Sequence, residues 1–539
     1  MLGTLDPQMD LLDTNAVCGH LLREGSIFAH LAALGDTLFC DEDFADLYDP
    51  RRGRHSVPPS LLAKVLLLQR LEDVSDPEAV ERIRCDLRWK GALGLPLLYE
   101  GFHPTVLVYF RQRLRASKAP RRIFDRFKQV AEEAGLLSRR GMRVLDSTPI
   151  LSAVATQDTV SMIRGGVRRL LNLVAGEDAD LAATLRQGLA RCDYDQGGKP
   201  AVDWDDQAQR EALVDELVRD ALGVLARLED KKLPDAVAEA AELVATVAGQ
   251  DVERDEGGRF RIRRGVAADR VISTVDPEAR HGRKSRAGGY DGYKANVAVD
   301  PETELVTEVT VTPANTPDAD PTMELLPELA RNPHPEGSDT GGDATGAATD
   351  EDKALVVVAD TAYGSGANRR ALVDAGAELV IKAPPEANTT GGFLQSTFVI
   401  DLEAQTATCP AGQTTTEFHP AAKGGGRFQF PPAVCNHCPL RWDCTGSLKG
   451  RSLQVGPHHD LLVTARADQR TDGFKRIYKS KRPTVERVIS RIVRKGRTAR
   501  YRGRGRVEEQ VALKAAAENL VRMLRLGLVR DATTGWTLA

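Results

Sequence analysis

The sequence has no long hydrophobic run. None of its apolar stretches approaches the roughly 20 residues that a membrane-spanning helix needs, and its first residues lack the apolar core of a signal peptide. Cysteine is also scarce, with 8 in 539 residues. These shortages exclude a membrane-spanning protein and lead us to expect a cytoplasmic one, in which the cysteines stay reduced.

The composition is otherwise that of a globular protein, with 42% hydrophobic and 28% charged residues. The length allows two to four domains. The net charge of -4 averages unlike regions, because acidic residues gather in the middle and basic residues in the C-terminal third. A net-acidic chain with one intensely basic segment indicates a local nucleic-acid surface.

The most basic segment spans residues 475–506, with fourteen Lys or Arg and one acid, Glu486. Pro483 suits the first position of a helix, and Gly496 suits its end. Between them, apolar residues recur at helical spacing, which predicts a short amphipathic helix. These residues are Val485, Val488, Ile489 and Ile492.

A lone carboxylate would repel the nucleic acid that this surface attracts, unless a divalent cation stands between them. Glu486 is therefore a candidate metal ligand in a nuclease-like site. Two simpler interpretations stay open. The segment is a solvated charged face, or Glu486 is a helix-stabilising acid near an N-terminus that pairs with Arg482.

Residues 1–138 are predicted to be helical. In the helix that Pro104 opens, Val106, Phe110 and Leu114 can form a buried stripe. The stripe leaves three arginines elsewhere on the helix, which suits a DNA-binding domain of helix-turn-helix character. A helical bundle with solvating arginines is the alternative. The arginines are Arg111, Arg113 and Arg115.

Two aspartates follow short buried strands. Residues 142–145 precede Asp146, with Pro149 expected to stop the strand, and residues 355–359 precede Asp360. Asp is also a common turn residue, so either one alone is a weak signal. If the two strands lie side by side, both carboxylates point into one crevice.

The intervening stretches have different characters. Residues 158–265 have helical periodicity and are predicted to be an all-helical insertion without chemistry of its own. Residues 281–289 form a basic, glycine-containing loop, and 290–315 a hairpin that turns at Asp300-Pro301-Glu302-Thr303. Residues 331–353 are predicted to be a disordered acidic loop.

Four cysteines gather late in the chain, at Cys409, Cys435, Cys438 and Cys444. A Cys-x-x-Cys pair with two flanking thiolates suits a closed, structural zinc site. His419 or His437 could replace one ligand, and unrelated buried thiols are the alternative.

Taken in order, several motifs resemble the DDE transposases of bacterial insertion sequences, in the branch with a Tyr-Arg-Glu signature. They are VPPSLLAKVLLLQRLEDVSDPEAVERI, VLDST, DGYKANVAVD, TPANTPDAD, VVADTAYG and RPTVERVISRI. Tyr478, Arg482 and Glu486 are the residues of this sequence that correspond to the signature. Three residues separate the first two where the signature has two, and Val493 replaces its trailing Lys.

The resemblance implies an α/β fold with a ribonuclease H-like core, a mixed sheet flanked by helices. It implies that Asp146, Asp360 and Glu486 bind two Mg²⁺, for which Mn²⁺ can substitute, alongside the structural Zn²⁺. The expected parts are a helical DNA-binding domain (1–138), the first core strand (139–157), the helical insertion (158–265), the core (266–400), the zinc-binding insertion (401–455) and C-terminal helices (456–539).

The implied activity is cleavage at transposon ends and strand transfer into target DNA, by a homodimer on double-stranded DNA in the bacterial cytoplasm and nucleoid. A nuclease with the same core, a phosphohydrolase with Asp146 as nucleophile and an inactive DNA-binding protein are the alternatives. A phosphohydrolase usually has a second Asp where Thr148 stands. The candidate DNA contacts are Tyr478, Arg482, Arg494, Lys495, Arg500, Arg502, Arg283, Lys284, Lys294, Arg111, Arg113 and Arg115.

Overall fold

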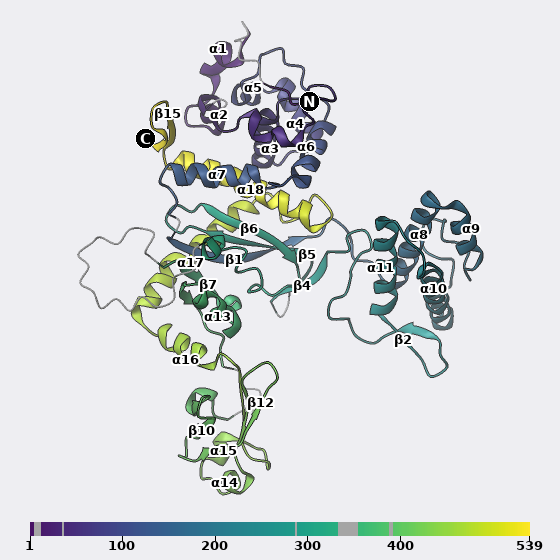
Figure 1. The fold of residues 1–539 in the computed structure, drawn as a ribbon, viewed down its shortest axis with the longest axis vertical. Helices are drawn as coiled ribbons and strands as arrows, with labels where there is room; N and C mark the ends of the chain where they lie inside the picture. Colours follow the sequence, from purple (N-terminus) through teal and green to yellow (C-terminus); the bar gives the residue numbers. More distant parts are fainter. Residues whose placement is uncertain (5–11, 35–36, 139, 286–287, 332–353, 387–391) are drawn as a thin grey trace.

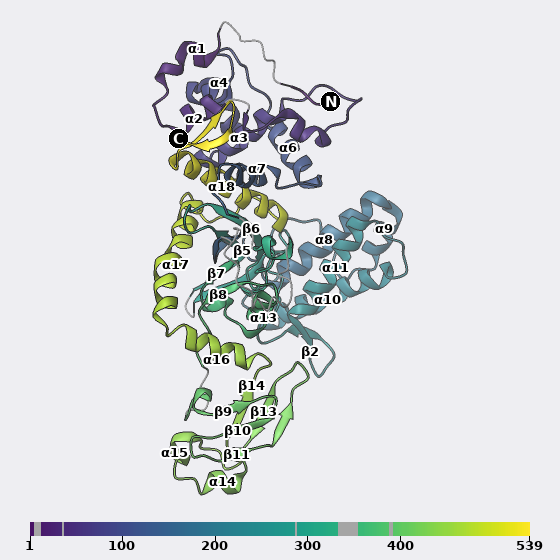
Figure 2. The same cartoon turned by 60° about the vertical axis from the view of Figure 1, so that its left-hand side comes forward.

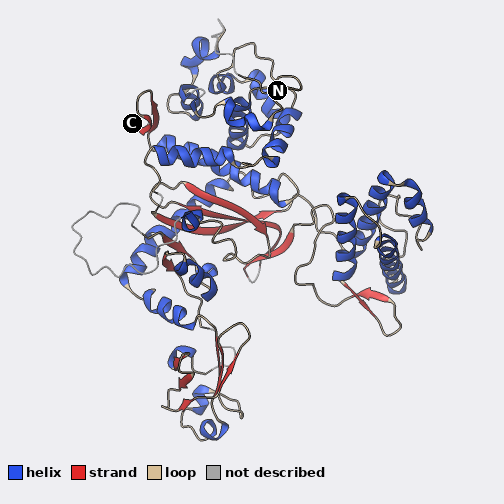
Figure 3. Cartoon of the chain, in the orientation of Figure 1, coloured by secondary structure: helices blue, strands red, loops and turns tan. Residues whose placement is uncertain are grey.

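The computed structural model describes residues 1–4, 12–34, 37–138, 140–285, 288–331, 354–386 and 392–539. A mixed sheet lies at the centre, between an N-terminal group of helices and a small cysteine-containing segment, with a helical insertion to one side (Figures 1 and 3). The predicted mixed α/β class is confirmed. Within the described ranges, no helix is long and apolar enough to cross a membrane.

The central sheet has the order β4-β5-β1-β7-β8, and β6 also pairs with β5. β1 pairs antiparallel with β5 and parallel with β7, and β7 is parallel to β8. The strands are β1 (Met142–Leu151), β4 (Arg280–Ser285), β5 (Gly288–Val299), β6 (Val306–Pro313), β7 (Val356–Ala359) and β8 (Glu378–Ile381).

β1 is longer than predicted, because it continues through Pro149 to Leu151. Its pairing with β7 stops at Val144, so the second half of β1 has only β5 beside it as a strand partner. Proline is tolerated where one edge of a strand needs no backbone donor. Asp146 therefore lies inside β1, at the point where β7 ends.

The predicted hairpin is confirmed. β5 and β6 pair antiparallel, and Asp300 Oδ1 accepts hydrogen bonds from the backbone N–H groups of Glu302 and Thr303 in the turn. The prediction that residues 281–289 form a loop is wrong. Most of that stretch belongs to β4 and to the start of β5, which pair with each other.

Helices cover both faces of the sheet. α18 (Arg504–Arg525) packs on β6 and separates the sheet from the N-terminal helices, while α17 (Asp472–Ile492) packs on β1, β5 and β7 (Figures 1 and 2). α13 (Gly366–Asp374) joins the separate core on the other face. Residues far apart in sequence thus enclose one sheet.

The N-terminal part is helical, as predicted. In α6, Phe110 and Leu114 are buried, but Leu107 replaces Val106 in the stripe and Arg111 is buried as well. The helices are α1 (Thr14–Cys18), α2 (Ile27–Leu34), α3 (Pro59–Glu72), α4 (Asp76–Cys85), α5 (Leu87–Leu93), α6 (Thr105–Ala116) and α7 (Arg122–Glu133), with 3-10 helices at Gly19–Leu21 and Asp41–Leu47.

The insertion has its own hydrophobic core. The prediction that it is all helical is wrong in one respect, because a two-stranded hairpin follows its last helix. Its elements are α8 (Thr159–Glu177), α9 (Ala179–Gln187), α10 (Gln207–Leu228), α11 (Asp235–Gln250), β2 (Val252–Arg254) and β3 (Phe260–Ile262). The acidic loop predicted over 331–353 lies, beyond Arg331, outside the described residues.

The cysteine-containing segment consists of short strands around a small aromatic core. Its strands are β9 (Val399–Asp401), β10 (Thr406–Thr408), β11 (Thr414–Thr415), β12 (Phe418–Pro420), β13 (Gly426–Gln429) and β14 (Ser452–Val455), and its helices α14 (Pro432–Asn436) and α15 (Arg441–Cys444). The remaining elements are α12 (Pro327–Arg331), α16 (His459–Asp468), β15 (Leu528–Asp531), β16 (Gly535–Leu538) and 3-10 helices at Thr361–Tyr363 and Gln395–Thr397.

Candidate active site

The register between β1 and β7 brings the two aspartates together. Val144 lies opposite Val358 in this parallel pair. Asp146 and Asp360 each follow two residues later, so they continue the same register on the same face, because side chains alternate along a strand. That face shares its core with the apolar residues of α17. The prediction of one crevice for both carboxylates therefore agrees with the sheet topology.

The helix α17 carries the third carboxylate, Glu486. It begins at Asp472, where the Thr471 hydroxyl accepts a hydrogen bond from the backbone N–H of Phe474. The prediction that Pro483 opens this helix is wrong, because Pro483 lies inside it. An interior proline removes one backbone bond. The helix nevertheless continues to Ile492, and its buried apolar residues after Arg482 pack with the sheet core.

The guanidinium of Arg482 lies among the three carboxylates. Its Nη2 is 3.0 Å from Oδ2 of Asp146 and 3.7 Å from Oδ2 of Asp360. Its Nη1 is 3.5 Å from Oε1 of Glu486, one helical turn further on. The Arg482–Glu486 pairing that the simpler interpretation predicted is present, but in mid-helix, and the same arginine also contacts both aspartates.

The three carboxylate side chains differ in their exposure to solvent. The Asp146 side chain is 18% exposed, that of Asp360 40% and that of Glu486 65%. Burial raises the pKa of Asp146, and Asp360 adds to this effect, while the charge of Arg482 and a hydrogen bond from the Ser147 N–H oppose it. The pKa of Arg482 is raised by Asp146 and Asp360, although burial acts to lower it.

The donor chemistry fits a divalent cation, because carboxylate oxygens are the ligands that Mg²⁺ prefers. In the structure, however, Arg482 supplies the positive charge between them. No group of three or more His, Cys, Asp or Glu side chains in the described part of the chain is placed to hold a metal ion. Metal binding here would need the guanidinium to give up contacts with the carboxylates.

Two tyrosines flank this site. Tyr363, just beyond Asp360, is fully buried, and its hydroxyl has no hydrogen-bond partner among the described residues. Burial raises the pKa of Tyr363 well above its ordinary value, and nearby Asp318 and Asp146 raise it further. Tyr478, predicted to contact DNA, stacks on Phe474 with ring centroids 5.7 Å apart. The position of Tyr363 within VVADTAYG was the available signal, and sequence reasoning did not use it.

The turn between β5 and β6 holds α17 in place. Glu304 accepts hydrogen bonds from Arg487 at 2.7 Å and from Arg491 at 2.8 Å, and its side chain is only 14% exposed. Burial acts to raise the pKa of Glu304, but these two arginines lower it overall. Glu304 also has a positive φ of 60°. Sequence reasoning assigned these arginines no role.

The predicted DNA contacts divide into two groups. Arg113, Arg283, Lys284, Arg494 and Arg502 are exposed. Apart from Tyr478 and Arg482, described above, the others bind residues of the protein itself, although Lys495 and Arg500 are exposed as well. The pairs are Lys294 with Asp318, Arg111 with Asp76, Arg115 with Glu509, Lys495 with the Leu71 carbonyl and Arg500 with Asp73.

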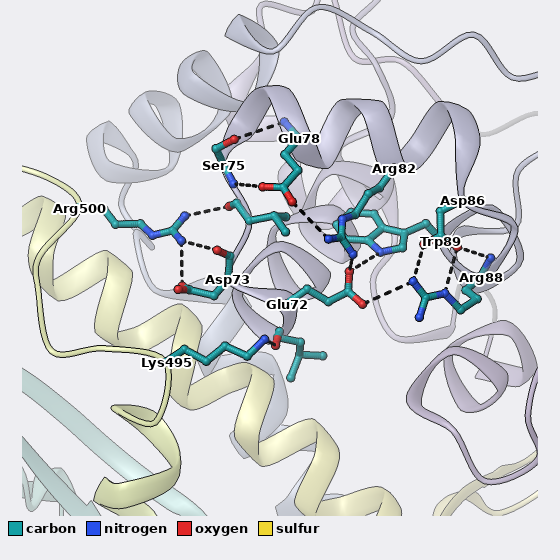
Figure 4. Close-up of polar contacts among 12 residues, drawn as sticks. Glu72, Asp73, Ser75, Glu78, Arg82, Asp86, Arg88, Trp89, Lys495 and Arg500 are labelled. Atoms are coloured by element: carbon teal, nitrogen blue, oxygen red, sulfur yellow. Dashed lines mark hydrogen bonds and ion pairs between the residues drawn. The ribbon is translucent and has the colours of Figure 1, made fainter.

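Lys495 and Arg500 fasten the basic segment to the N-terminal helices (Figure 4). The ammonium of Lys495 donates to the Leu71 carbonyl at 2.8 Å. Arg500 donates to the Val74 carbonyl at 2.8 Å and lies 3.0 Å from Oδ1 of Asp73. These contacts give both residues a structural role, and their contact with DNA stays a prediction.

The four cysteines of the late segment lie near one another. Burial raises the pKa of the Cys444 thiol, Arg451 opposes it, and the other three cysteines raise it further. The backbone N–H of Arg451 also donates to Cys435 Sγ at 3.4 Å. As the described residues stand, the four cysteines are not placed as a group that could hold a metal ion, so the structure does not support a zinc site. Zinc binding stays a prediction from the cysteine spacing.

Two carboxylates from the sheet and a third from the basic helix α17 make the kind of site expected of an enzyme acting on phosphodiesters. Residues 408–524 match the family model described as Transposase DDE domain, and residues 17–113 match Transposase domain (DUF772). Together the two matches support a DDE-type insertion-sequence transposase, which confirms the predicted class. The comparisons with curated proteins and with solved structures gave no match.

Proposed function

We propose that this protein cuts DNA at transposon ends and joins the cut ends to target DNA. The observation that carries the proposal is the convergence of Asp146, Asp360 and Glu486 on Arg482, from two parallel strands and one helix. The mixed sheet flanked by helices supports the ribonuclease H-like core that the resemblance implies. The two family matches support the class.

Asp146, Asp360 and Glu486 would together hold two Mg²⁺, or Mn²⁺ in their place. Bound divalent ions activate an oxygen nucleophile and neutralise the leaving oxygen of a phosphodiester. Asp146 is fixed by β1 and by burial, whereas the exposed Glu486 can adjust to the substrate. Before metal binds, Arg482 would keep the three carboxylates together and offset their mutual repulsion.

DNA binding would draw on the exposed cations, which attract phosphates without reading sequence. Arg494 extends the site along the basic segment, and Arg113 places a charge on α6. Recognition of the terminal repeats is proposed for the N-terminal helices. Two transposon ends need two sites, so we propose a homodimer on DNA.

The test uses a duplex that carries the inverted repeats bracketing the coding sequence, with Mg²⁺ and a second DNA as target. Wild-type protein should nick the repeat end and join it to the target. Asp146→Ala, Asp360→Ala and Glu486→Ala should each abolish nicking while duplex binding persists. Asp374→Ala is the control, because this exposed Asp on α13 has, among the described residues, an ion pair only with Arg370.

The outcomes separate the alternatives. Nicking without joining would support a nuclease with the same carboxylates, and phosphate release from small esters would support a phosphohydrolase. Nicking that survives any one of the three alanine substitutions would overturn the proposed site.

A further inference from the structure

A basic cleft lies between the helical insertion and the segment that returns from it to the sheet. Its volume is about 680 Å³, and α8, the turn around Lys199 and residues 274–275 line it. No Asp or Glu lies among the described residues of its wall. The five cations of the wall are Arg164, Arg168, Arg169, Lys199 and Arg502.

The five cations differ in how far the protein already binds them. Lys199 lies over the Trp204 ring, 5.4 Å from its centroid, and Arg164 lies 3.8 Å from Oδ2 of Asp193. Arg164 is structural, because it is buried and donates to backbone carbonyls of the turn that leads to Lys199. Arg169 only reaches the Thr274 carbonyl, at 3.4 Å. Neither Arg168 nor Arg502 has an ion pair or hydrogen bond to another residue in the described ranges, and both are exposed. Apart from Asp193 beside Arg164, no carboxylate forms an ion pair with these cations in the described ranges, and gathered cations repel one another, so they favour an anionic ligand.

Of the acidic residues near the cleft, Asp193 pairs with Arg164 of the wall, whereas Asp276 and Glu278 have partners outside it. Asp276 accepts hydrogen bonds from the Tyr293 hydroxyl and from the Gly503 N–H. Glu278 accepts from the Arg504 N–H at 2.8 Å. These two contacts also fix the loop that presents Arg502, so the cationic wall of the cleft is held in a defined position.

The basic segment links the cleft to the carboxylates. After α17, the backbone N–H of Leu151, at the end of the strand that carries Asp146, donates to the Arg497 carbonyl at 2.9 Å. The segment then continues to Arg502, which is part of the cleft wall. Exposed cations therefore follow one stretch of chain from the site toward the insertion.

We propose that this cleft binds the phosphate backbone of duplex DNA away from the position of cleavage. The proposal rests on the proposed function, and it assigns a role to an insertion in which the sequence showed no chemistry. Arginine suits this task, because its planar fork matches phosphate oxygens and stays charged. The contacts would add affinity without sequence preference.

The test measures duplex binding without divalent metal, so it does not depend on catalysis. Arg168→Gln with Arg169→Gln removes two charges from the cleft. Arg227→Gln with Lys232→Gln removes two exposed charges of the same insertion that do not line the cleft. Fluorescence anisotropy with a duplex of arbitrary sequence gives the affinity at several NaCl concentrations for each protein.

The cleft variant should bind about tenfold more weakly at moderate salt. Its plot of log affinity against log salt concentration should be shallower by about 1 to 2, because each lost phosphate contact removes about 0.9 from the slope. The control variant should match wild type. Arg168→Lys with Arg169→Lys should keep the slope, and melting temperatures should show that all variants fold.

A cleft variant with wild-type affinity and slope would overturn the inference and leave the proposed function intact. An equal loss in the control variant would overturn it too, since the effect would then be one of net charge. Failure of the wild-type protein to bind duplex DNA at all would instead count against the proposed function.

Discussion

Nη2 of Arg482 lies 3.0 Å from Oδ2 of Asp146, and both side chains are largely buried. This contact places a protein cation where DDE enzymes are expected to gather divalent ions. A metal ion bound at Oδ2 of Asp146 would crowd the guanidinium that contacts this oxygen. We therefore predict that the arginine and the ion compete for Asp146, even though each stabilises its negative charge.

We predict that Arg482→Gln lowers the stability of the metal-free protein by about 3 kcal/mol, because it leaves a buried carboxylate without its counter-charge. Mg²⁺ should then raise the melting temperature of this variant more than that of wild type, since the ion no longer displaces an arginine. Thermal unfolding over a Mg²⁺ titration measures both effects. The double variant Arg482→Gln with Asp146→Asn is the control, and it should lose most of the additional rise in melting temperature that Mg²⁺ gives Arg482→Gln. An equal Mg²⁺ response in wild type and Arg482→Gln would contradict competition.

Glu304 provides a second prediction, because it ties α17 to the β5–β6 turn through two arginines. Glu304→Gln should loosen the helix that carries Arg482 and Glu486. We expect cleavage to slow by about tenfold, since small displacements of catalytic groups cost rate steeply. Single-turnover cleavage measures this rate, and duplex binding should change little.

Glu302→Gln is the matched control for Glu304. Glu302 pairs with Lys481 of the same helix, but its side chain is 68% exposed. Exposed ion pairs contribute little. The control should therefore cleave at the wild-type rate, and equal slowing in both variants would show that Glu304 has no special part in holding α17.

Local signals were enough to predict several parts of this structure. The buried run before Asp360 and the turn residues at Asp300 predicted β7 and the β5–β6 hairpin, because each depends on neighbours in sequence. The apolar spacing around Glu486 similarly predicted a helix there.

Non-local packing decided the rest. Pro483 resembled a helix start, but α17 begins at the Thr471 cap and contacts four strands of the sheet, β1, β5, β7 and β8. The meeting of Asp146 with Asp360 needs the β1–β7 register, set by residues more than 200 positions apart. Neither follows from composition or periodicity.

A third prediction separates two arginines of α6. Arg111 is buried and paired with Asp76, whereas Arg113 is exposed above the Tyr48 ring. Arg111→Met should lower the free energy of unfolding by on the order of 3 kcal/mol, because it leaves a partly buried carboxylate unpaired. Arg113→Met should stay within about 0.5 kcal/mol of wild type. Denaturant unfolding measures both free energies. An Arg111→Met variant as stable as Arg113→Met would contradict the structural role of Arg111.

The Arg111 effect should depend on pH with a definite sign. Burial acts to raise the pKa of Asp76, but hydrogen bonds from Arg111 and Gln69 lower it overall. A carboxyl with a lowered folded-state pKa contributes stability above its unfolded pKa, and this contribution is lost as pH falls through the folded pKa. The gap between wild type and Arg111→Met should thus be full at neutral pH and shrink below about pH 4. A gap that widens in acid would contradict this assignment.

The last prediction concerns the metal that Asp360 would hold. Asp360 is the intermediate carboxylate in exposure, and its 40% exposed side chain leaves room for exchange. Asp360→Cys replaces a hard oxygen with a thiolate, which Mg²⁺ binds poorly and softer divalent ions bind better. Cleavage by this variant should be lost in Mg²⁺ and partly return in Mn²⁺, whereas Asp360→Asn should stay inactive in both. Gel assays of strand cleavage at matched metal concentrations measure the difference. The alternative is a purely structural role for Asp360, through the Arg482 guanidinium that lies 3.7 Å from its Oδ2. In that case the Asp360→Cys variant would lose activity equally in both metals, and this result would exclude Asp360 as a metal ligand.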